Sequence, residues 1–206
     1  MLVCDEHKFV FLRNPKTASR SVSAALSEKF DVRQVGIYHD WKIPEELTGY
    51  FVFAVVRNPY VRAVSGWMHW SKRPETNDFS LVWMGDSYEA TSNSRLAFGK
   101  WTQKFIQPID KIIFPKGRHW KRQTEILDKI GSDVHLIRYE NLEEDLNSLS
   151  FIDNIVLPSI GVQDYGDWRT HYTPEIEARV YQACKEDFVR LGYKRWHFDK
   201  GQIALL

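Results

Sequence analysis

The longest uninterrupted apolar run in the chain is Tyr50–Val56, which reads YFVFAVV. Its apolar residues are continuous and do not alternate with polar ones, so a strand formed here is expected to be covered on both faces, as in a parallel sheet. A shorter run, Phe9–Leu12, has the same character. Polar residues and a proline end each run, and a helix-like pattern follows. Both runs are therefore interpreted as buried strands that lead into helices.

The rest of the chain continues this alternation, which is typical of an α/β domain with a mostly parallel central sheet. Ligands of such sheets usually bind beyond the carboxyl ends of the strands. We therefore expect the residues that follow Leu12 and Val56 to lie on the ligand-binding edge. The further strands expected are Asp31–Ile37, Lys111–Phe114 and Val134–Tyr139, and the further helices are Ile43–Leu47, Pro59–Trp70, Ser94–Lys104, Trp120–Ile130, Asn141–Leu149 and one that Thr173 caps and Gly192 ends.

A single domain spanning residues 1–206 is expected, because this length can bury a substantial core and no repeat or clear linker interrupts it. The net charge is only +1, so the composition does not indicate a nucleic-acid partner. The two cysteines, Cys4 and Cys184, lack zinc-site spacing, and no metal site is expected. No signal peptide or membrane-length apolar segment is recognisable, which predicts a soluble, cytoplasmic chain without a membrane partner.

The turn after Phe9–Leu12 carries a lysine and several hydroxyls and reads RNPKTASRS. Backbone N–H groups at a helix N-terminus, a lysine ammonium and hydroxyl donors together favour a bound phosphate or sulfate ester. The alternative is a basic surface turn with an ordinary helix cap. No glycine precedes Gly36, so the turn is not a Walker A loop, and this counts against an ATP-hydrolysing enzyme.

A second polar stretch, RNPYVRAVS, follows Tyr50–Val56. Arg57 stands where the strand ends, and Ser65 lies two helical turns further on, so a guanidinium and a hydroxyl can hold one phosphate from two directions. Alternatively, Arg57 pairs with a carboxylate and Ser65 packs against the sheet. Two such sites on one sheet edge suit a ligand with two separated anionic groups.

Three blocks of the sequence, PKTASRS, RNPYVRAVS and YTPEIEARVYQACKEDFVRLGY, resemble the PAPS-dependent sulfotransferases. The resemblance covers most of residues 8–193 and is to the carbohydrate-type branch, which includes heparan 2-O-sulfotransferases and bacterial homologues. It implies a P-loop NTPase-like three-layer fold with a central, mostly parallel sheet. It also implies transfer of a sulfuryl group from PAPS to a hydroxyl-bearing acceptor, with a carbohydrate as the expected acceptor and PAP as the product.

The resemblance further implies roles for individual residues. Arg57 and Ser65 would hold the 3′-phosphate, and Arg169 would lie near the nucleotide. Lys16 would stabilise the leaving phosphate, by analogy with phosphoryl transfer. The 5′-phosphosulfate loop would consist of Lys16, Thr17, Ala18, Ser19, Arg20 and Ser21.

Two positions of this loop depart from the family pattern. Ala18 stands where glycine is frequent, and Arg20 stands where threonine or serine is frequent. Arg20 either adds positive charge at the phosphosulfate or points away and leaves the contact to backbone N–H groups.

The catalytic base is expected to be His39, in the segment YHDW between the two anion motifs. This segment resembles the one that supplies the base in the 2-O-sulfotransferase group. The alternative for His39 is an exposed loop histidine, and His69 is the second choice for the base.

Two rival functions stay open at this point. One is a small-molecule kinase or another nucleotide-phosphate enzyme on a related fold, against which the missing Walker A glycines and metal-binding carboxylates count. The other is a nucleotide- or glycan-binding module without catalysis, which Ala18 and Arg20 would favour.

Overall fold

The computed structural model describes residues 1–36, 42–71, 98–99, 102, 121–130, 133–162 and 164–198. The chain divides into two compact units, and each is assembled from two separate stretches. The first unit comprises Met1–Asn58 and Phe114–Asp164, and the second comprises Pro59–Ile113 and Tyr165–Leu206. The strand predicted at Lys111–Phe114 and most of the helix predicted at Ser94–Lys104 lie outside the described residues.

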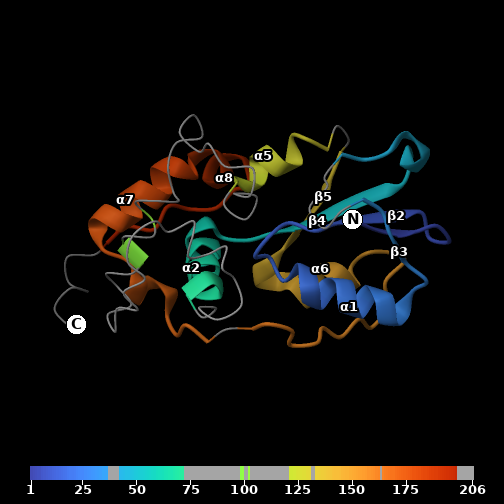
Figure 1. Ribbon diagram of the computed structural model, residues 1–206, viewed down its shortest axis with the longest axis horizontal. Helices are drawn as coiled ribbons and strands as arrows, with labels where there is room; N and C mark the ends of the chain where they lie inside the picture. The colour runs from blue at the N-terminus through green and yellow to red at the C-terminus, as the bar shows by residue number, and fades with distance from the viewer. Residues whose placement is uncertain are drawn as a thin grey trace. The chain divides into compact units, whose positions relative to one another are not determined.

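The first unit is built on a mixed sheet (Figure 1). Its described strands are β1 (Leu2–Cys4), β2 (Phe9–Leu12), β3 (Arg33–Gln34), β4 (Phe51–Val56) and β5 (His135–Arg138). They are ordered β3-β1-β2-β4-β5. β1 pairs antiparallel with β2 and β3, whereas the pairs β2–β4 and β4–β5 are parallel. Every strand except β1 therefore runs in the same direction, which confirms the predicted α/β class with a mostly parallel sheet.

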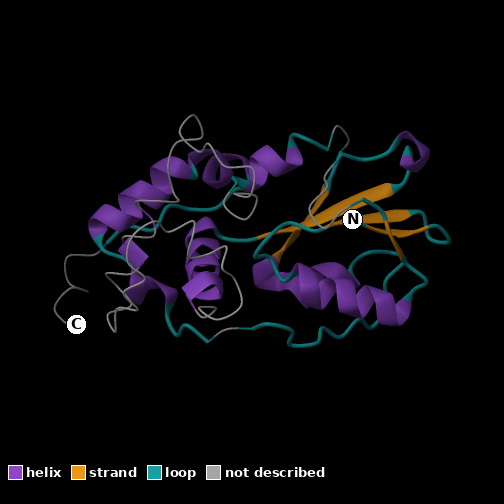
Figure 2. Cartoon of the chain, viewed as in Figure 1, coloured by secondary structure: helices purple, strands orange, loops and turns teal. Residues whose placement is uncertain are grey.

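Helices cover both faces of this sheet. The helical elements of the unit are α1 (Ser19–Lys29), α5 (Gln123–Leu127), α6 (Leu142–Asn147) and the short 3-10 helices η1 (Glu45–Leu47) and η4 (Tyr139–Asn141). One apolar core, which includes Phe11, lies between the sheet and the helices α1 and α6. The other core, which includes Leu12, lies between the opposite face and α5 with η1. Figure 2 shows the same three layers, with the strands in orange between helices in purple.

β1 was not predicted from the sequence, and β3 has only two residues where a longer strand was predicted at Asp31–Ile37. β1 is only three residues long and is followed at once by the charged turn Asp5–Lys8, so no local pattern distinguished it from a polar N-terminus. Its residues are nevertheless buried, because β1 pairs with a strand on each side.

The second unit consists mainly of helices in its described part. They are α2 (Pro59–Ser71), α7 (Pro174–Ala183), α8 (Lys185–Arg190) and the 3-10 helix η5 (Trp168–His171). The predicted cap is confirmed, because the Thr173 side chain accepts a hydrogen bond from the backbone N–H of Ile176. The helix predicted to continue to Gly192 is interrupted at Cys184, whose backbone is not helical. None of the described helices is long and apolar enough to cross a membrane.

An aromatic core holds the second unit together. Tyr60 on α2 is fully buried and stacks on Trp168, with ring centres 5.6 Å apart and an interplanar angle of 6°. Its hydroxyl donates a hydrogen bond to Glu177 of α7. Arg195 binds the same carboxylate through two nitrogens, at 3.0 and 2.9 Å. The carboxylate of Glu177 therefore joins the first turn of α2, the first turn of α7 and the segment around Arg195.

Candidate functional site

The loop between β2 and α1 has alternating backbone conformations. φ is positive at Lys16 (67°) and at Ala18 (61°) and negative at Thr17 between them. Such alternation turns successive backbone N–H groups toward a common side, and concavities of this kind bind anions. α1 begins directly afterwards at Ser19, and its first turn, all of it described, contains no acidic side chain. The loop and the helix N-terminus therefore form a backbone cradle suited to a phosphate or sulfate group.

Two hydroxyl side chains of this loop, those of Thr17 and Ser21, have hydrogen-bond partners within the unit. Thr17 Oγ1 donates a hydrogen bond to the backbone carbonyl of Asn14 at 2.9 Å, which closes the loop on itself. Ser21 Oγ accepts a hydrogen bond from the backbone N–H of Ile160 at 3.3 Å, and its own hydrogen can therefore be donated to an anion. Ser19 is buried at the start of the helix. This geometry leaves the Thr17 backbone N–H and the Ser21 hydroxyl hydrogen as the groups that can face an anion, and their role in binding one stays a prediction.

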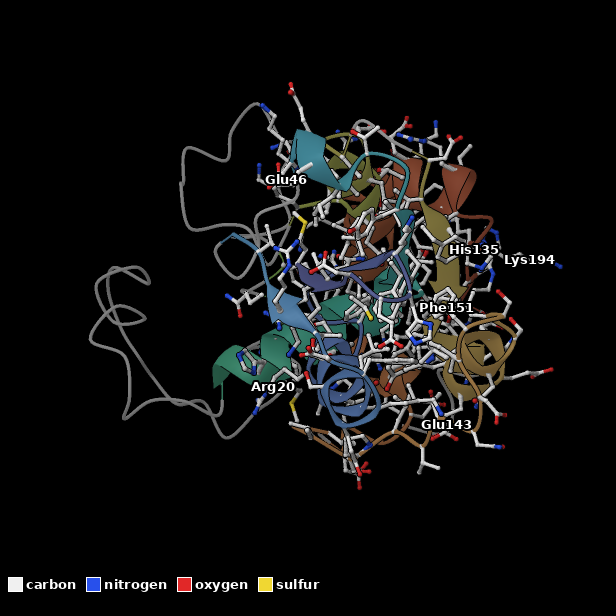
Figure 3. The ribbon with its side chains drawn as sticks, turned by 90° about the vertical axis from the view of Figure 1, so that its right-hand side faces the viewer. Arg20, Glu46, His135, Glu143, Phe151 and Lys194 are labelled. Atoms are coloured by element: carbon white, nitrogen blue, oxygen red, sulfur yellow. The ribbon has the colours of Figure 1, made fainter. Side chains whose placement is uncertain are left out.

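Arg20 is exposed on α1, where Figure 3 labels it. Its guanidinium Nη1 lies 3.2 Å from the point that a Cβ would occupy at Gly161. Gly161 has a φ of 66°, which suits a residue without a Cβ. The Arg20 charge is thus placed beside the segment that contains Gly161, and its contribution to a bound anion stays a prediction.

Arg57 connects the end of β4 to the Lys16 loop. Its side chain is buried, and Nη1 donates a hydrogen bond to the backbone carbonyl of Lys16 at 3.3 Å. The guanidinium carbon lies 3.7 Å from the centre of the Tyr139 ring, a cation–π contact that fixes the plane of the charge. The structure therefore brings together two of the predicted anion-binding residues, Arg57 and Lys16, at the carboxyl ends of neighbouring parallel strands.

A buried glutamine on α5 joins the same two strand ends. Gln123 Oε1 accepts hydrogen bonds from the Arg57 backbone N–H at 2.9 Å and from Asn14 Nδ2 at 3.2 Å. Gln123 Nε2 donates to the Arg57 carbonyl at 2.8 Å. Asn14 Nδ2 also donates to the Val55 carbonyl in β4, at 3.0 Å. Gln123 and Asn14 were not predicted as site residues, because only the fold brings these polar side chains together.

Two further residues that were predicted to contact the donor nucleotide, Ser65 and Arg169, belong to the second unit. Ser65 lies on α2 and is half-buried. Arg169 lies in η5, and its Nη1 is 2.9 Å from Asp167 Oδ2, with both side chains about half exposed. Exposed ion pairs of this kind contribute roughly 0–1 kcal/mol, so an anionic ligand can compete with Asp167 for the guanidinium. The placement of both residues at a donor nucleotide stays a prediction.

The predicted base, His39, lies outside the described residues. The second choice, His69, is on α2 and half-buried. Among the described residues, no group of three or more histidine, cysteine, aspartate or glutamate side chains is arranged to hold a metal ion.

The carboxylate of Glu177, which joins the elements of the second unit, and the Tyr60 hydroxyl bonded to it both have shifted pKa values. Burial alone would raise the pKa of Glu177, but the hydrogen bonds from Arg195 and Tyr60 outweigh it and hold that pKa below its ordinary value. Burial and the hydrogen bond to Glu177 raise the pKa of Tyr60 well above that of a free phenol. Tyr60 is therefore a neutral hydrogen-bond donor to an ionised carboxylate at neutral pH.

The chain was also compared with known proteins. A model of the sulfotransferase family matches residues 1–199, nearly the full length. The comparisons with curated proteins and with solved structures returned no match. Sulfuryl transfer to an acceptor is the chemistry that this family carries out, and an anion cradle beside a buried arginine fits it. Because the match extends over residues 1–199, the chain belongs to the sulfotransferase family.

Proposed function

We propose that this protein transfers a sulfuryl group from PAPS to a hydroxyl of a carbohydrate. PAPS carries two separated anionic groups, the 5′-phosphosulfate and the 3′-phosphate. The observation that carries the proposal is the contact between Arg57 and the Lys16 loop, which places a buried guanidinium beside an anion cradle at the ends of two parallel strands. The strand–loop–helix order and the helices on both sheet faces support a P-loop NTPase-like arrangement of the first unit.

In this proposal the Lys16–Ser21 loop binds the phosphosulfate through its backbone N–H groups and the Ser21 hydroxyl. Arg57, Ser65 and Arg169 bind the 3′-phosphate side of the nucleotide, and the assignments of Ser65 and Arg169 rest on the sequence resemblance. An S–O bond forms with the acceptor oxygen while the S–O bond to the 5′-phosphate breaks. The Lys16 ammonium stabilises the negative charge that develops on the departing phosphate. His39 takes the proton of the acceptor hydroxyl, and PAP leaves.

The proposal is tested with radiolabelled PAPS and a panel of hydroxyl-bearing glycans. The wild-type protein is expected to label at least one of them. The His39→Ala variant should lose about 10²-fold or more in rate, because general-base catalysis contributes about that much, while PAP binding is retained. His69→Ala is the matched control and should stay active.

Retained transfer by His39→Ala would remove His39 from the mechanism and move the assignment to His69 if that variant is inactive. If the wild-type protein binds PAP but labels no acceptor, the non-catalytic binding module becomes the better explanation.

A further inference from the structure

Gln123 is a completely buried polar side chain at the first position of α5. Its amide pairs with both the N–H and the C=O of Arg57, the first residue after β4, as a neighbouring strand would. Because Arg57 is followed by a helix and not by more strand, this pairing fixes the backbone at the point from which the guanidinium side chain extends.

The hydrogen bonds of Gln123 complete a closed ring. From Gln123 the ring passes to Asn14, then along the loop to Lys16, whose carbonyl accepts from the Arg57 guanidinium, and from Arg57 back to Gln123. Thr17 braces the loop within this ring through its bond to Asn14. Asn14, Thr17, Arg57 and Gln123 are each at least nine-tenths buried. Hydrogen bonds in such surroundings are electrostatically strong, and a group left unpaired there is costly.

We propose that Gln123 is a positioning residue for the donor nucleotide. Its amide fixes the distance between the phosphosulfate loop and the Arg57 guanidinium, and this distance determines how strongly a nucleotide with two anionic groups is preferred over one with a single group. A ligand that must contact both loops gains affinity from their fixed spacing, whereas a ligand that contacts one loop does not. The inference rests on the proposed function, because it assumes that the two loops bind one PAPS molecule.

The test compares PAP with AMP, which has the 5′-phosphate but lacks the 3′-phosphate. Dissociation constants for both are measured by calorimetry on the full chain. Gln123→Glu keeps the size of the side chain, but a carboxylate cannot donate to the Arg57 carbonyl. The preference for PAP over AMP is expected to fall by about tenfold in this variant, because the spacing of the two loops is no longer fixed.

A milder variant and a matched control make the result decisive. Gln123→Asn keeps the amide and shortens the side chain by one methylene, so it is the variant to use if Gln123→Glu does not fold. Its preference for PAP should fall by about threefold or more, since the shorter amide cannot hold both partners. Ile126→Val, on the same helix and in the neighbouring core, should leave the preference unchanged even if it lowers the melting temperature.

The outcomes separate the two claims. An unchanged preference in a folded Gln123 variant, with wild-type protein that binds PAP more tightly than AMP, overturns the positioning role and leaves the proposed function intact. A wild-type protein that does not bind PAP overturns the proposed function, and the role of Gln123 with it. A loss of preference that Ile126→Val reproduces would show a general effect of destabilisation and would also overturn the positioning role.

Discussion

Lys16 and Ala18 hold left-handed backbone conformations in a single four-residue turn. Each costs an L-residue roughly 1–2 kcal/mol, because its Cβ approaches the following carbonyl oxygen. The buried contacts of Asn14, Thr17 and Arg57 hold the turn in this shape. The conformation of Ala18 also explains why glycine is frequent at this position in the family pattern, since glycine has no Cβ.

Replacing Ala18 with glycine should therefore stabilise the protein. Glycine removes about 1–2 kcal/mol of backbone strain from the folded state. It also raises the entropy of the unfolded chain, which costs roughly 0.4–1 kcal/mol of stability. The unfolding free energy should therefore increase by about 0.5–1 kcal/mol. Urea unfolding measures it. Ala25→Gly, in the interior of the helix α1 that follows this turn, is the control and should lower the unfolding free energy by about 1 kcal/mol or more. A loss of stability in Ala18→Gly similar to that of the control would contradict the left-handed conformation.

The side chain of Lys16 is expected to act in the chemical step. Lys16→Ala should reduce the rate of sulfuryl transfer by about 10²–10³-fold, because a charge that stabilises the leaving group is worth about that much. Lys8→Ala is a closely matched control, since Lys8 is also a lysine with positive φ (49°) but stands at the opposite end of β2. Single-turnover rates with labelled PAPS measure both variants. Near-normal transfer by Lys16→Ala would exclude Lys16 from the mechanism.

At the scale of elements, the sequence predicted the strands β2 and β4, the polar loops that follow them and the helices α1 and α2. The signal for both loops was the polar, proline-containing stretch that ends each apolar run, Arg-Asn-Pro in both cases. The partner that joins the loops was not predictable, because Gln123 is 66 residues from Arg57 and 109 residues from Asn14. Side-chain hydrogen bonds between such distant positions leave no periodic pattern in the sequence.

Glu177 is a second residue whose role in the structure could not be predicted from the sequence. From sequence alone it is an acidic residue in the first turn of a helix, where it complements the helix dipole. In the structure it is buried and joins α2, α7 and Arg195 through hydrogen bonds from Tyr60 and Arg195. Its ionised form is therefore part of the core of the second unit.

This carboxylate should make stability depend on pH. The folded-state pKa of Glu177 is lowered, so its contribution is present above the unfolded pKa of about 4.5 and is lost as the pH falls through the folded pKa. Glu177→Gln should be less stable than wild type near pH 7, and the difference in unfolding free energy should narrow as the pH is lowered below about 4.5. Urea unfolding across this range measures the difference, with Glu186→Gln, an exposed acidic residue in the first turn of α8, as the control. A difference that stays constant with pH would show that Glu177 is not stabilised as an anion.

At the scale of the whole molecule, the chain passes between its two units three times, after Asn58, after Ile113 and after Asp164. The alternation of strands with helices and the continuous apolar runs predicted the α/β class and the edge of the sheet on which the loops lie. They did not predict the division into units, because it depends on contacts between stretches far apart in sequence. Neither unit is a continuous segment, and we propose that the chain nevertheless folds as the single domain predicted for residues 1–206.

The central claim is that the two strand-end loops bind one PAPS-type nucleotide. Calorimetric titration of PAP into the wild-type protein and into Arg57→Ala tests it most directly, with Arg33→Ala, an exposed arginine of β3, as the control. We predict one PAP bound per wild-type chain, affinity reduced by more than about tenfold, or 1.4 kcal/mol, in Arg57→Ala, and wild-type affinity in the control. Absence of PAP binding by the wild-type protein, or unchanged affinity in Arg57→Ala, would contradict the claim.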